Sequence, residues 1–183
     1  MPKRMIIFVY FNLINNSYMK QLSHILLTTA ILLIASVCVA QQIDYRKIGT
    51  PLPDLKVVDR SDIVYTKLDI TENRNFFLVM FNPQCGHCVD AAKVFRNNKL
   101  LFDDNTVMFV TVAEMMEMLP AFAGEVDWID GANMILGVDS AQVIADLFNY
   151  VAVPQVNIYD ADYKLIKVLN GDIKLEDLQA YIR

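Results

Sequence analysis

The sequence predicts an α/β domain with a central mixed β-sheet flanked by helices. Two observations support this class. Residues 75–82 (NFFLVMFN) and 107–112 (VMFVTV) are short apolar runs rich in aromatic and β-branched residues, the pattern of strands buried on both faces. Between them, residues 86–98 place apolar side chains at helical spacing. A strand, a helix and a second strand in this order predict a parallel, right-handed βαβ unit.

The segments on either side of this unit are less regular. Before it, residues 55–58 are predicted to be a short strand and residues 65–68 to pair with it. After it, residues 114–124 (EMMEMLPAFAG) indicate a short helix broken near Pro120, and residues 125–139 a long connection containing a short strand. The three methionines in this segment are interpreted as packing residues rather than Cu(I) ligands, because methionine commonly fills irregular gaps in cores: Met115, Met116 and Met118.

The C-terminal part predicts two more helices and a hairpin. Ser140 is a candidate N-cap for a helix over residues 141–149. Residues 155–160 and 162–169 are predicted to be strands joined by a tight turn, which makes them an antiparallel hairpin. A final helix is predicted over residues 174–182, so that the sheet has helices on its flanks.

The N-terminal part predicts targeting rather than fold. Residues 19–40 (MKQLSHILLTTAILLIASVCVA) have the positive start, the apolar stretch and the small-x-small end of a secretory signal peptide, with cleavage predicted after Ala40. Residues 1–18 do not fit such a signal, and we interpret them as a mis-annotated N-terminal extension with translation starting at Met19. Residues 41–183 then form one domain.

Two other interpretations of the N-terminal segment also imply export. Extended upstream, the apolar stretch approaches the length of a membrane anchor. Cys38 is the attachment site in a lipoprotein interpretation, although Val37 directly before it is a poor fit. We therefore expect an exported, periplasmic protein, with a membrane-anchored form facing the periplasm as the alternative.

The charge of the mature chain argues against a nucleic-acid partner. Removal of residues 1–40 takes away three of the 16 basic residues and none of the 21 acidic ones, which leaves a net charge of −8. Proteins that bind nucleic acid neutralise phosphates with clustered Lys and Arg. A strongly acidic balance mainly keeps an exported domain soluble.

The cysteines of the mature chain are concentrated in one motif. The motif CGHC holds Cys85 and Cys88, and His87 between them is the only histidine outside the predicted signal. A structural zinc site needs four ligands, usually from two such pairs, so no metal is predicted here. A disulfide that closes so short a loop adds little stability. The motif is therefore predicted to be a dithiol that cycles between reduced and oxidised states, with no other cofactor.

The predicted order of elements, with CGHC at a helix start and Val153-Pro154 before the hairpin, resembles the thioredoxin fold. The resemblance covers essentially the whole mature chain. The segment TPLPDLKVVD at 50–59, the longer connection after Val112 and the signal look like the exported TlpA/ResA-type thiol–disulfide oxidoreductases. The sequence departs from the family at Asn82-Pro83 and Gln84.

The resemblance implies roles for the residues of this site. Cys85, at the helix N-terminus where an anion is stabilised, is expected to be the nucleophile, and Cys88 the resolving thiol. Gly86-His87 is also the dipeptide of protein disulfide isomerases, and His87 is expected to tune the couple toward oxidation. Pro154 resembles the cis-proline that faces the active site in this fold, and with Val153 it is expected to shape a groove for the client.

The family's proton-relay carboxylates are not at their expected places. One position holds Val79 and the other Ala91, so Asp90, Glu114 or a water molecule is left as a possible relay. The sequence does not choose among these three.

The function expected from these features is reduction of disulfides in client proteins, as part of cell redox homeostasis. A disulfide oxidase or isomerase with the same site is the alternative in direction. A non-catalytic binding module, a metal chaperone or a peroxidase are alternatives in kind. The expected partners are client proteins with thiols or disulfides, and a membrane protein that donates or accepts electrons.

Overall fold

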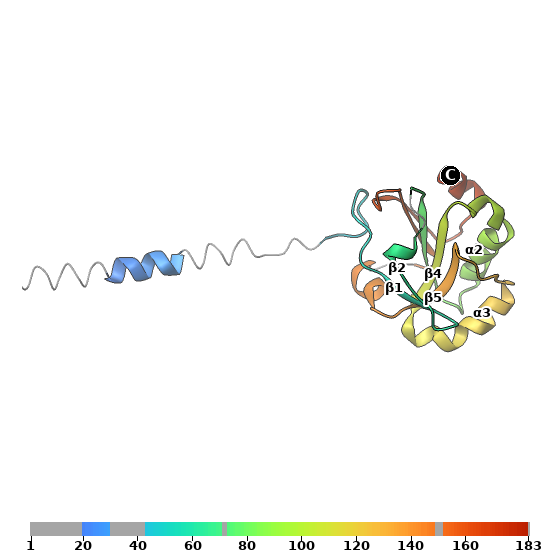
Figure 1. Ribbon diagram of the computed structural model, residues 1–183, viewed down its shortest axis with the longest axis horizontal. Helices are drawn as coiled ribbons and strands as arrows, with labels where there is room; N and C mark the ends of the chain where they lie inside the picture. Colours follow the sequence, from blue (N-terminus) through green and yellow to red (C-terminus); the bar gives the residue numbers. More distant parts are fainter. Residues whose placement is uncertain (1–19, 30–42, 71–72, 149–151, 183) are drawn as a thin grey trace, which may run out of the picture. The chain divides into compact units, whose positions relative to one another are not determined.

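A computed structural model describes residues 20–29, 43–70, 73–148 and 152–182. The chain divides into two units, residues 1–42 and 43–183. In the first unit, residues 20–29 form an exposed helix (Figure 1). The rest of the predicted signal peptide and the predicted extension at 1–18 lie outside the described residues. Among the helices that are described, none has both the length and the apolar character that a membrane span requires.

The second unit is built on a seven-stranded mixed sheet in the order β2-β1-β5-β4-β3-β6-β7 (Figure 1). Strands β3, β4 and β5 are parallel at its centre, and the outer pairs are antiparallel. The strands are β1 Lys56–Asp59, β2 Val64–Thr66, β3 Phe76–Met80, β4 Thr106–Val112, β5 Met134–Asp139, β6 Gln155–Tyr159 and β7 Leu165–Asn170. The predicted fold class, a mixed sheet flanked by helices, is confirmed.

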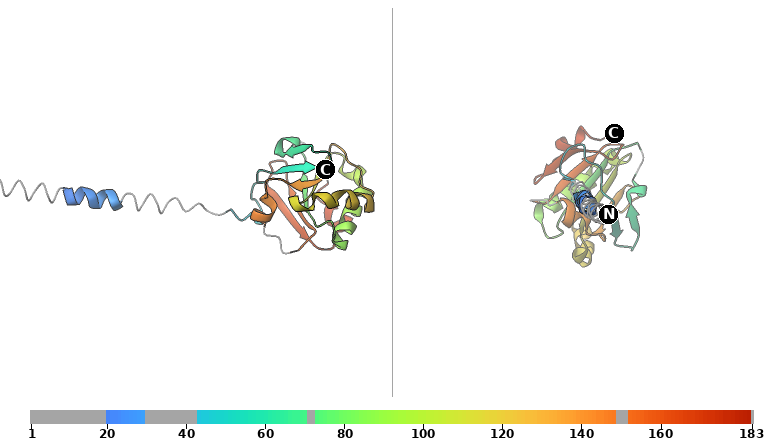
Figure 2. Two further views of the ribbon diagram at one scale, coloured as in Figure 1. Left: turned by 90° about the horizontal axis from the view of Figure 1, so that it is seen from below. Right: turned by 90° about the vertical axis from the view of Figure 1, so that its left-hand side faces the viewer.

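The helices of this unit are α2 Gly86–Asn97, α3 Leu119–Glu125 and α4 Leu175–Gln179. Short 3-10 segments span Lys67–Asp69, Lys99–Phe102 and Ala113–Met118, and a π-helical turn spans Ile144–Phe148. In Figure 1 and in the left view of Figure 2, α2 (green) and α3 (yellow) lie near each other. Both contribute to the same core cluster, together with α4.

The central βαβ unit forms as predicted because its strands are buried on both faces. Every residue of β3 is buried, and β3 pairs in parallel with β4. Alternate residues of β3 enter different cores: Phe77 and Val79 pack beneath α2, whereas Leu78 and Met80 pack on the opposite face. The sheet therefore separates two hydrophobic cores.

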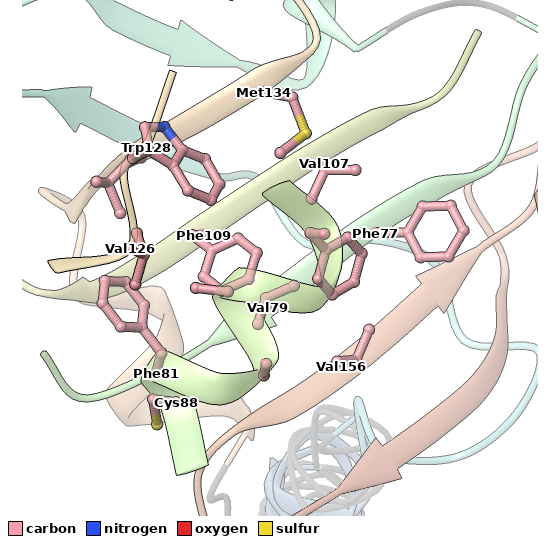
Figure 3. Packing of buried hydrophobic residues seen from close by; sticks show 14 of the residues in the cluster. Phe77, Val79, Phe81, Cys88, Val107, Phe109, Val126, Trp128, Met134 and Val156 are labelled. Carbon is pink, nitrogen blue, oxygen red and sulfur yellow. The ribbon is translucent and has the colours of Figure 1, made fainter. Parts of the chain in front are cut away.

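The core beneath α2 is dominated by aromatic rings. Phe109 lies 5.4 Å from Phe95 and 5.0 Å from Trp128, measured between ring centroids. Phe81, the first residue after β3, lies 4.7 Å from Phe122 of α3. Figure 3 shows this layer, with Cys88 at its edge on the side of Phe81. The aromatic layer gives α2 a rigid base.

Two predicted elements near β5 and β2 differ in the structure. The helix predicted over 141–149 is a π-helical turn, and residue 149 lies outside the described residues. Ser140 is not its N-cap: the Ser140 hydroxyl donates to the Lys56 carbonyl oxygen at 2.9 Å. The Asp139 carboxylate caps the turn instead, accepting from the Ile144 N–H at 2.6 Å. The strand predicted over 65–68 ends at Thr66, where a 3-10 turn leaves Leu68 exposed.

Two helix boundaries also follow local hydrogen bonding. The predicted break near Pro120 is a change from 3-10 to α-helix, with the proline in the first turn of α3, where a missing N–H costs nothing. The last helix, α4, ends at Gln179 rather than at residue 182. The Asn75 side chain donates to the Tyr181 carbonyl oxygen at 2.7 Å and ties this end of the chain to the start of β3.

Candidate active site

The CGHC motif lies at the carboxyl end of β3, where the chain turns into α2. The Phe81 N–H donates to the Val110 carbonyl oxygen at 3.2 Å, so pairing with β4 continues one residue past β3. The Cys85 N–H then donates to the Asn82 carbonyl oxygen at 3.0 Å and closes the turn. Cys85 is the N-cap of α2, with extended backbone angles. Its position is therefore fixed by both the central sheet and the helix.

Cys85 is half-buried, and its sulfur faces the chain segment that precedes β6. The distance from the Cys85 Sγ to the Val153 carbonyl oxygen is 3.8 Å. The first turn of a helix has N–H groups without intrahelical partners and the positive end of the helix dipole. A thiolate is the form of a cysteine that such a position stabilises, and the thiolate is the form that attacks disulfides.

Cys88 is fully buried behind Cys85, one turn into α2. Burial raises the pKa of the Cys88 thiol to about 12, although the Asn82 N–H, 3.4 Å from the sulfur, acts in the opposite direction. The neighbouring Cys85 adds to the increase in pKa. Both cysteines are free in this structure, so it represents the reduced protein. At neutral pH the reduced site therefore holds Cys88 as a protonated thiol.

Val153 and Pro154 lie beside the cysteines, as the sequence indicated. The peptide bond between them is cis. Strand β6 pairs antiparallel with β3, with Gln155 opposite Met80, which brings the segment before β6 to the segment after β3. Pro154 is buried and Val153 is half-buried. The fold thus joins two sequence regions 68 residues apart into one site.

His87 and Gly86 form the outer surface of the motif. Both are exposed on the first turn of α2. A Cβ atom added at Gly86 would have no heavy atom within 4 Å, so packing does not require a glycine there. Open space at this turn leaves the approach to Cys85 unobstructed on that side.

The two positions where the family has carboxylates are apolar and buried. Val79 and Ala91 are both part of the core beneath α2. Asp90 and Glu114, the two relay candidates from the sequence, are exposed. Glu114 lines a cavity of about 180 Å³ at the carboxyl ends of β4 and β5. Among the described residues, the groups that act on the Cys88 thiol are the Asn82 N–H and Cys85, and neither is a carboxylate.

Asn82 is the residue of this site that the sequence analysis noted without assigning a role. Its backbone N–H contacts the sulfur of Cys88, and its side-chain Oδ1 accepts from the Gln84 N–H at 2.9 Å. An asparagine directly after a strand and before a proline is typical of a turn in which the side chain bonds to the backbone two residues on. This signal was available in the sequence.

The methionine segment does not form a metal site in the described part of the chain. Met116 packs against the core beneath α2, in agreement with the packing interpretation. Across the described ranges, no group of three or more His, Cys, Asp and Glu side chains is arranged as metal ligands.

No protein-family model matches this sequence, and no curated protein matches it either. Solved structures do match. A proposed protein disulfide isomerase from Bacteroides thetaiotaomicron is 18% identical, with a TM-score of 0.60 over 74% of this chain and 86% of that chain. The thioredoxin domain of a thiol–disulfide oxidoreductase from Bacteroides vulgatus is 14% identical, with a TM-score of 0.59 over 75% of this chain and 99% of that one.

A third similar structure is an exposed lipoprotein thioredoxin from Streptococcus pneumoniae. It is 16% identical, with a TM-score of 0.54 over 70% of this chain and 98% of that chain. At these identities the likeness concerns the fold. The chain has a thioredoxin-like fold, which it shares with thiol–disulfide oxidoreductases.

Proposed function

We propose that this protein is an exported thiol–disulfide oxidoreductase of the TlpA/ResA type that reduces disulfides in client proteins through Cys85 and Cys88. One observation carries the proposal. A half-buried thiol caps α2 and faces the Val153 carbonyl, while a second thiol lies fully buried behind it. One accessible sulfur and one shielded sulfur on the same helical turn are what a two-step exchange requires.

The first step of the proposed reaction uses Cys85. Its thiolate attacks one sulfur of the client disulfide, a bond forms between Cys85 and that sulfur, and the other client sulfur leaves as a thiolate. The Val153 backbone, next to the Cys85 sulfur, offers peptide groups that pair with an extended client segment. Burial keeps Cys88 protonated during this step, so the client meets a single reactive sulfur.

The second step uses Cys88. It loses its proton and attacks the Cys85 sulfur, a Cys85–Cys88 disulfide forms, and the second client sulfur leaves as a thiolate. The client gains two electrons and the protein loses two. A membrane protein that donates electrons is the proposed partner that restores the dithiol.

Disulfide isomerisation or oxidation is the second candidate function, and the position of His87 favours it. His87 is exposed between the two cysteines, where a positive charge or a hydrogen-bond donor stabilises the Cys85 thiolate. Stabilisation of the reduced form makes the disulfide a stronger oxidant. Reactivation of ribonuclease with scrambled disulfides, compared with simple insulin reduction, separates the two directions.

Export is part of the proposal. Residues 19–40 are proposed to be the signal peptide and residues 41–183 the mature domain. Expression of the full chain in a Gram-negative host, followed by mass spectrometry of the periplasmic fraction, is expected to find a mature N-terminus at Gln41. A protein retained in the cytoplasm with its N-terminal segment intact would contradict the assignment.

Insulin reduction tests the catalytic part. With dithiothreitol as the electron source, the wild-type domain is expected to accelerate precipitation of the insulin B chain, and Cys85→Ser is expected to abolish this acceleration. Fluorescence of the buried Trp128 shows whether both proteins are folded. A folded wild-type domain without turnover would favour the binding-module alternative, and Cu(I) binding by the thiols the metal-chaperone alternative.

A further inference from the structure

Asn82 connects the central sheet to both cysteines through three hydrogen bonds. Its carbonyl oxygen accepts from the Cys85 N–H at 3.0 Å. Its side-chain Oδ1 accepts from the Gln84 N–H at 2.9 Å. Its own N–H donates to the Cys88 Sγ at 3.4 Å, a normal separation for a hydrogen bond to sulfur. One residue thus closes the turn and contacts the buried thiol.

The residues around Asn82 favour this geometry. Pro83 is buried and has no N–H, so the turn has one donor fewer to satisfy. A residue before proline is restricted to extended backbone angles, which limits the conformations of Asn82 itself. The side chain of Asn82 then fixes the next two residues through its bond to Gln84. Alanine at position 82 would keep the backbone N–H but lose this bond.

We propose that Asn82 is a positioning residue, which holds the turn between β3 and α2 so that its own backbone N–H supports the thiolate of Cys88 in the resolving step. This inference rests on the function proposed above. The contact matters because the step needs a charge on a fully buried sulfur. A hydrogen bond to the charged form stabilises that form in a site that excludes water.

The absence of the family's carboxylates increases the importance of this contact. Val79 and Ala91 carry no acidic group, and Asp90 and Glu114 are exposed. The Asn82 N–H is the group, among the described residues, that acts in favour of the Cys88 thiolate. Loss of its alignment is therefore expected to slow resolution and to leave the attack by Cys85 unaffected.

Reaction of the reduced domain with dithiobis(nitrobenzoate) separates the two steps. Cys85 attacks the aromatic disulfide and releases one nitrothiobenzoate, and Cys88 then attacks the mixed disulfide and releases the second. The absorbance of the released thiolate therefore rises in two phases. For Asn82→Ala, the second phase is expected to slow by about tenfold, the effect of one unit in thiol pKa at a fixed pH. The first phase is expected to stay unchanged.

Two further variants make this test specific. In Asn82→Ser the hydroxyl can replace Oδ1 as an acceptor, so the second phase is expected to recover in part. Asn98→Ala is the matched control, because Asn98 bonds to the Val94 carbonyl oxygen at 2.8 Å at the opposite end of α2. It is expected to lower stability and leave both phases at the wild-type rate.

The pH dependence of the second phase supplies an independent measure. For Asn82→Ala, the rise of this rate with pH is expected to lie at higher pH than in the wild type. Wild-type rates in both phases of Asn82→Ala, or an equal slowing of both, would overturn the inference. A wild-type protein without a second phase would instead overturn the proposed function, because no Cys85–Cys88 disulfide would then form.

Discussion

The sulfur of Cys85 lies 3.8 Å from the carbonyl oxygen of Val153, although the two residues are 68 positions apart in the sequence. The contact forms because β6 pairs antiparallel with β3 and both cysteine-bearing and proline-bearing segments leave the sheet at the same edge. The consequence is a thiol presented next to free backbone groups, which is the arrangement on which the proposed client reaction depends.

Removal of the resolving thiol is expected to trap the client. In Cys88→Ser, Cys85 can still attack a client disulfide, but no second thiol remains to release the product. Non-reducing electrophoresis is expected to show a complex with a disulfide-containing client that dithiothreitol dissolves. Cys85→Ser is the matched control and is expected to show no such complex, because Cys88 is buried. Equal complex formation by both variants would contradict the assigned roles.

The stability of the reduced protein is expected to fall at alkaline pH because of Cys88. Its pKa is raised to about 12 by burial, so the folded state keeps the proton that the unfolded chain loses near its ordinary value. The stabilising contribution is complete below that ordinary value and is lost as pH rises toward the folded-state pKa. Between these limits the free energy of unfolding is expected to fall by about 1.4 kcal/mol for each pH unit.

Denaturant unfolding followed by Trp128 fluorescence measures this effect. The reduced wild type is compared with Cys88→Ala at pH 8 and pH 10, so that the other titrating groups are common to both proteins. The wild type is expected to lose more stability than the variant over this interval. Equal losses would show that the Cys88 pKa is not raised by folding.

Replacement of His87 is expected to make the dithiol more reducing. His87 is exposed on the first turn of α2, so its removal should change the couple with little effect on packing. If it stabilises the Cys85 thiolate, His87→Ala lowers the reduction potential by about 30 mV for each tenfold change in the equilibrium constant. Equilibration with glutathione followed by thiol alkylation measures the potential. An unchanged potential would show that His87 has no tuning role.

Two glycines are expected to respond in opposite directions to alanine. A Cβ atom at Gly137 in β5 would lie 2.4 Å from the Val58 carbonyl oxygen, so the pairing of β1 with β5 would have to shift. Gly137→Ala is expected to cost about 1–3 kcal/mol of stability, the usual penalty of overpacking. At Gly124 in α3 there is open space, and Gly124→Ala is expected to stabilise by about 0.5–1 kcal/mol. Urea unfolding of both variants tests the pair, and a stable Gly137→Ala protein would contradict the predicted clash.

The parts of the fold that the sequence predicts well are those with strong local patterns. Strand β3 is an uninterrupted apolar run, α2 has helical spacing, and β6 and β7 are separated by a short polar turn. The pairing of β5 between β1 and β4 is a relation between distant segments, and no local pattern encodes it. The same limit explains the N-cap at residues 139–144, where two neighbouring residues could serve and the contact of Ser140 with Lys56 decides for Asp139.

The candidate site shows a similar division. Cys85 and Cys88 were identifiable because they are concentrated in one motif, and Pro154 because of its resemblance to the family. The contact between the Asn82 N–H and the Cys88 sulfur depends on how a turn closes over the start of a helix. Backbone donors have no signature in residue types, so such a contact emerges only with the structure.

The reduction potential of the Cys85–Cys88 pair in the purified domain tests the central claim most directly. The domain is equilibrated with redox buffers, and the free thiols are alkylated and counted by mass spectrometry. A disulfide that forms and breaks reversibly, with a potential near the thioredoxin value of about −270 mV, is the result predicted for a client reductase. A pair that forms no reversible disulfide in any buffer would contradict the claim that this site performs thiol–disulfide exchange.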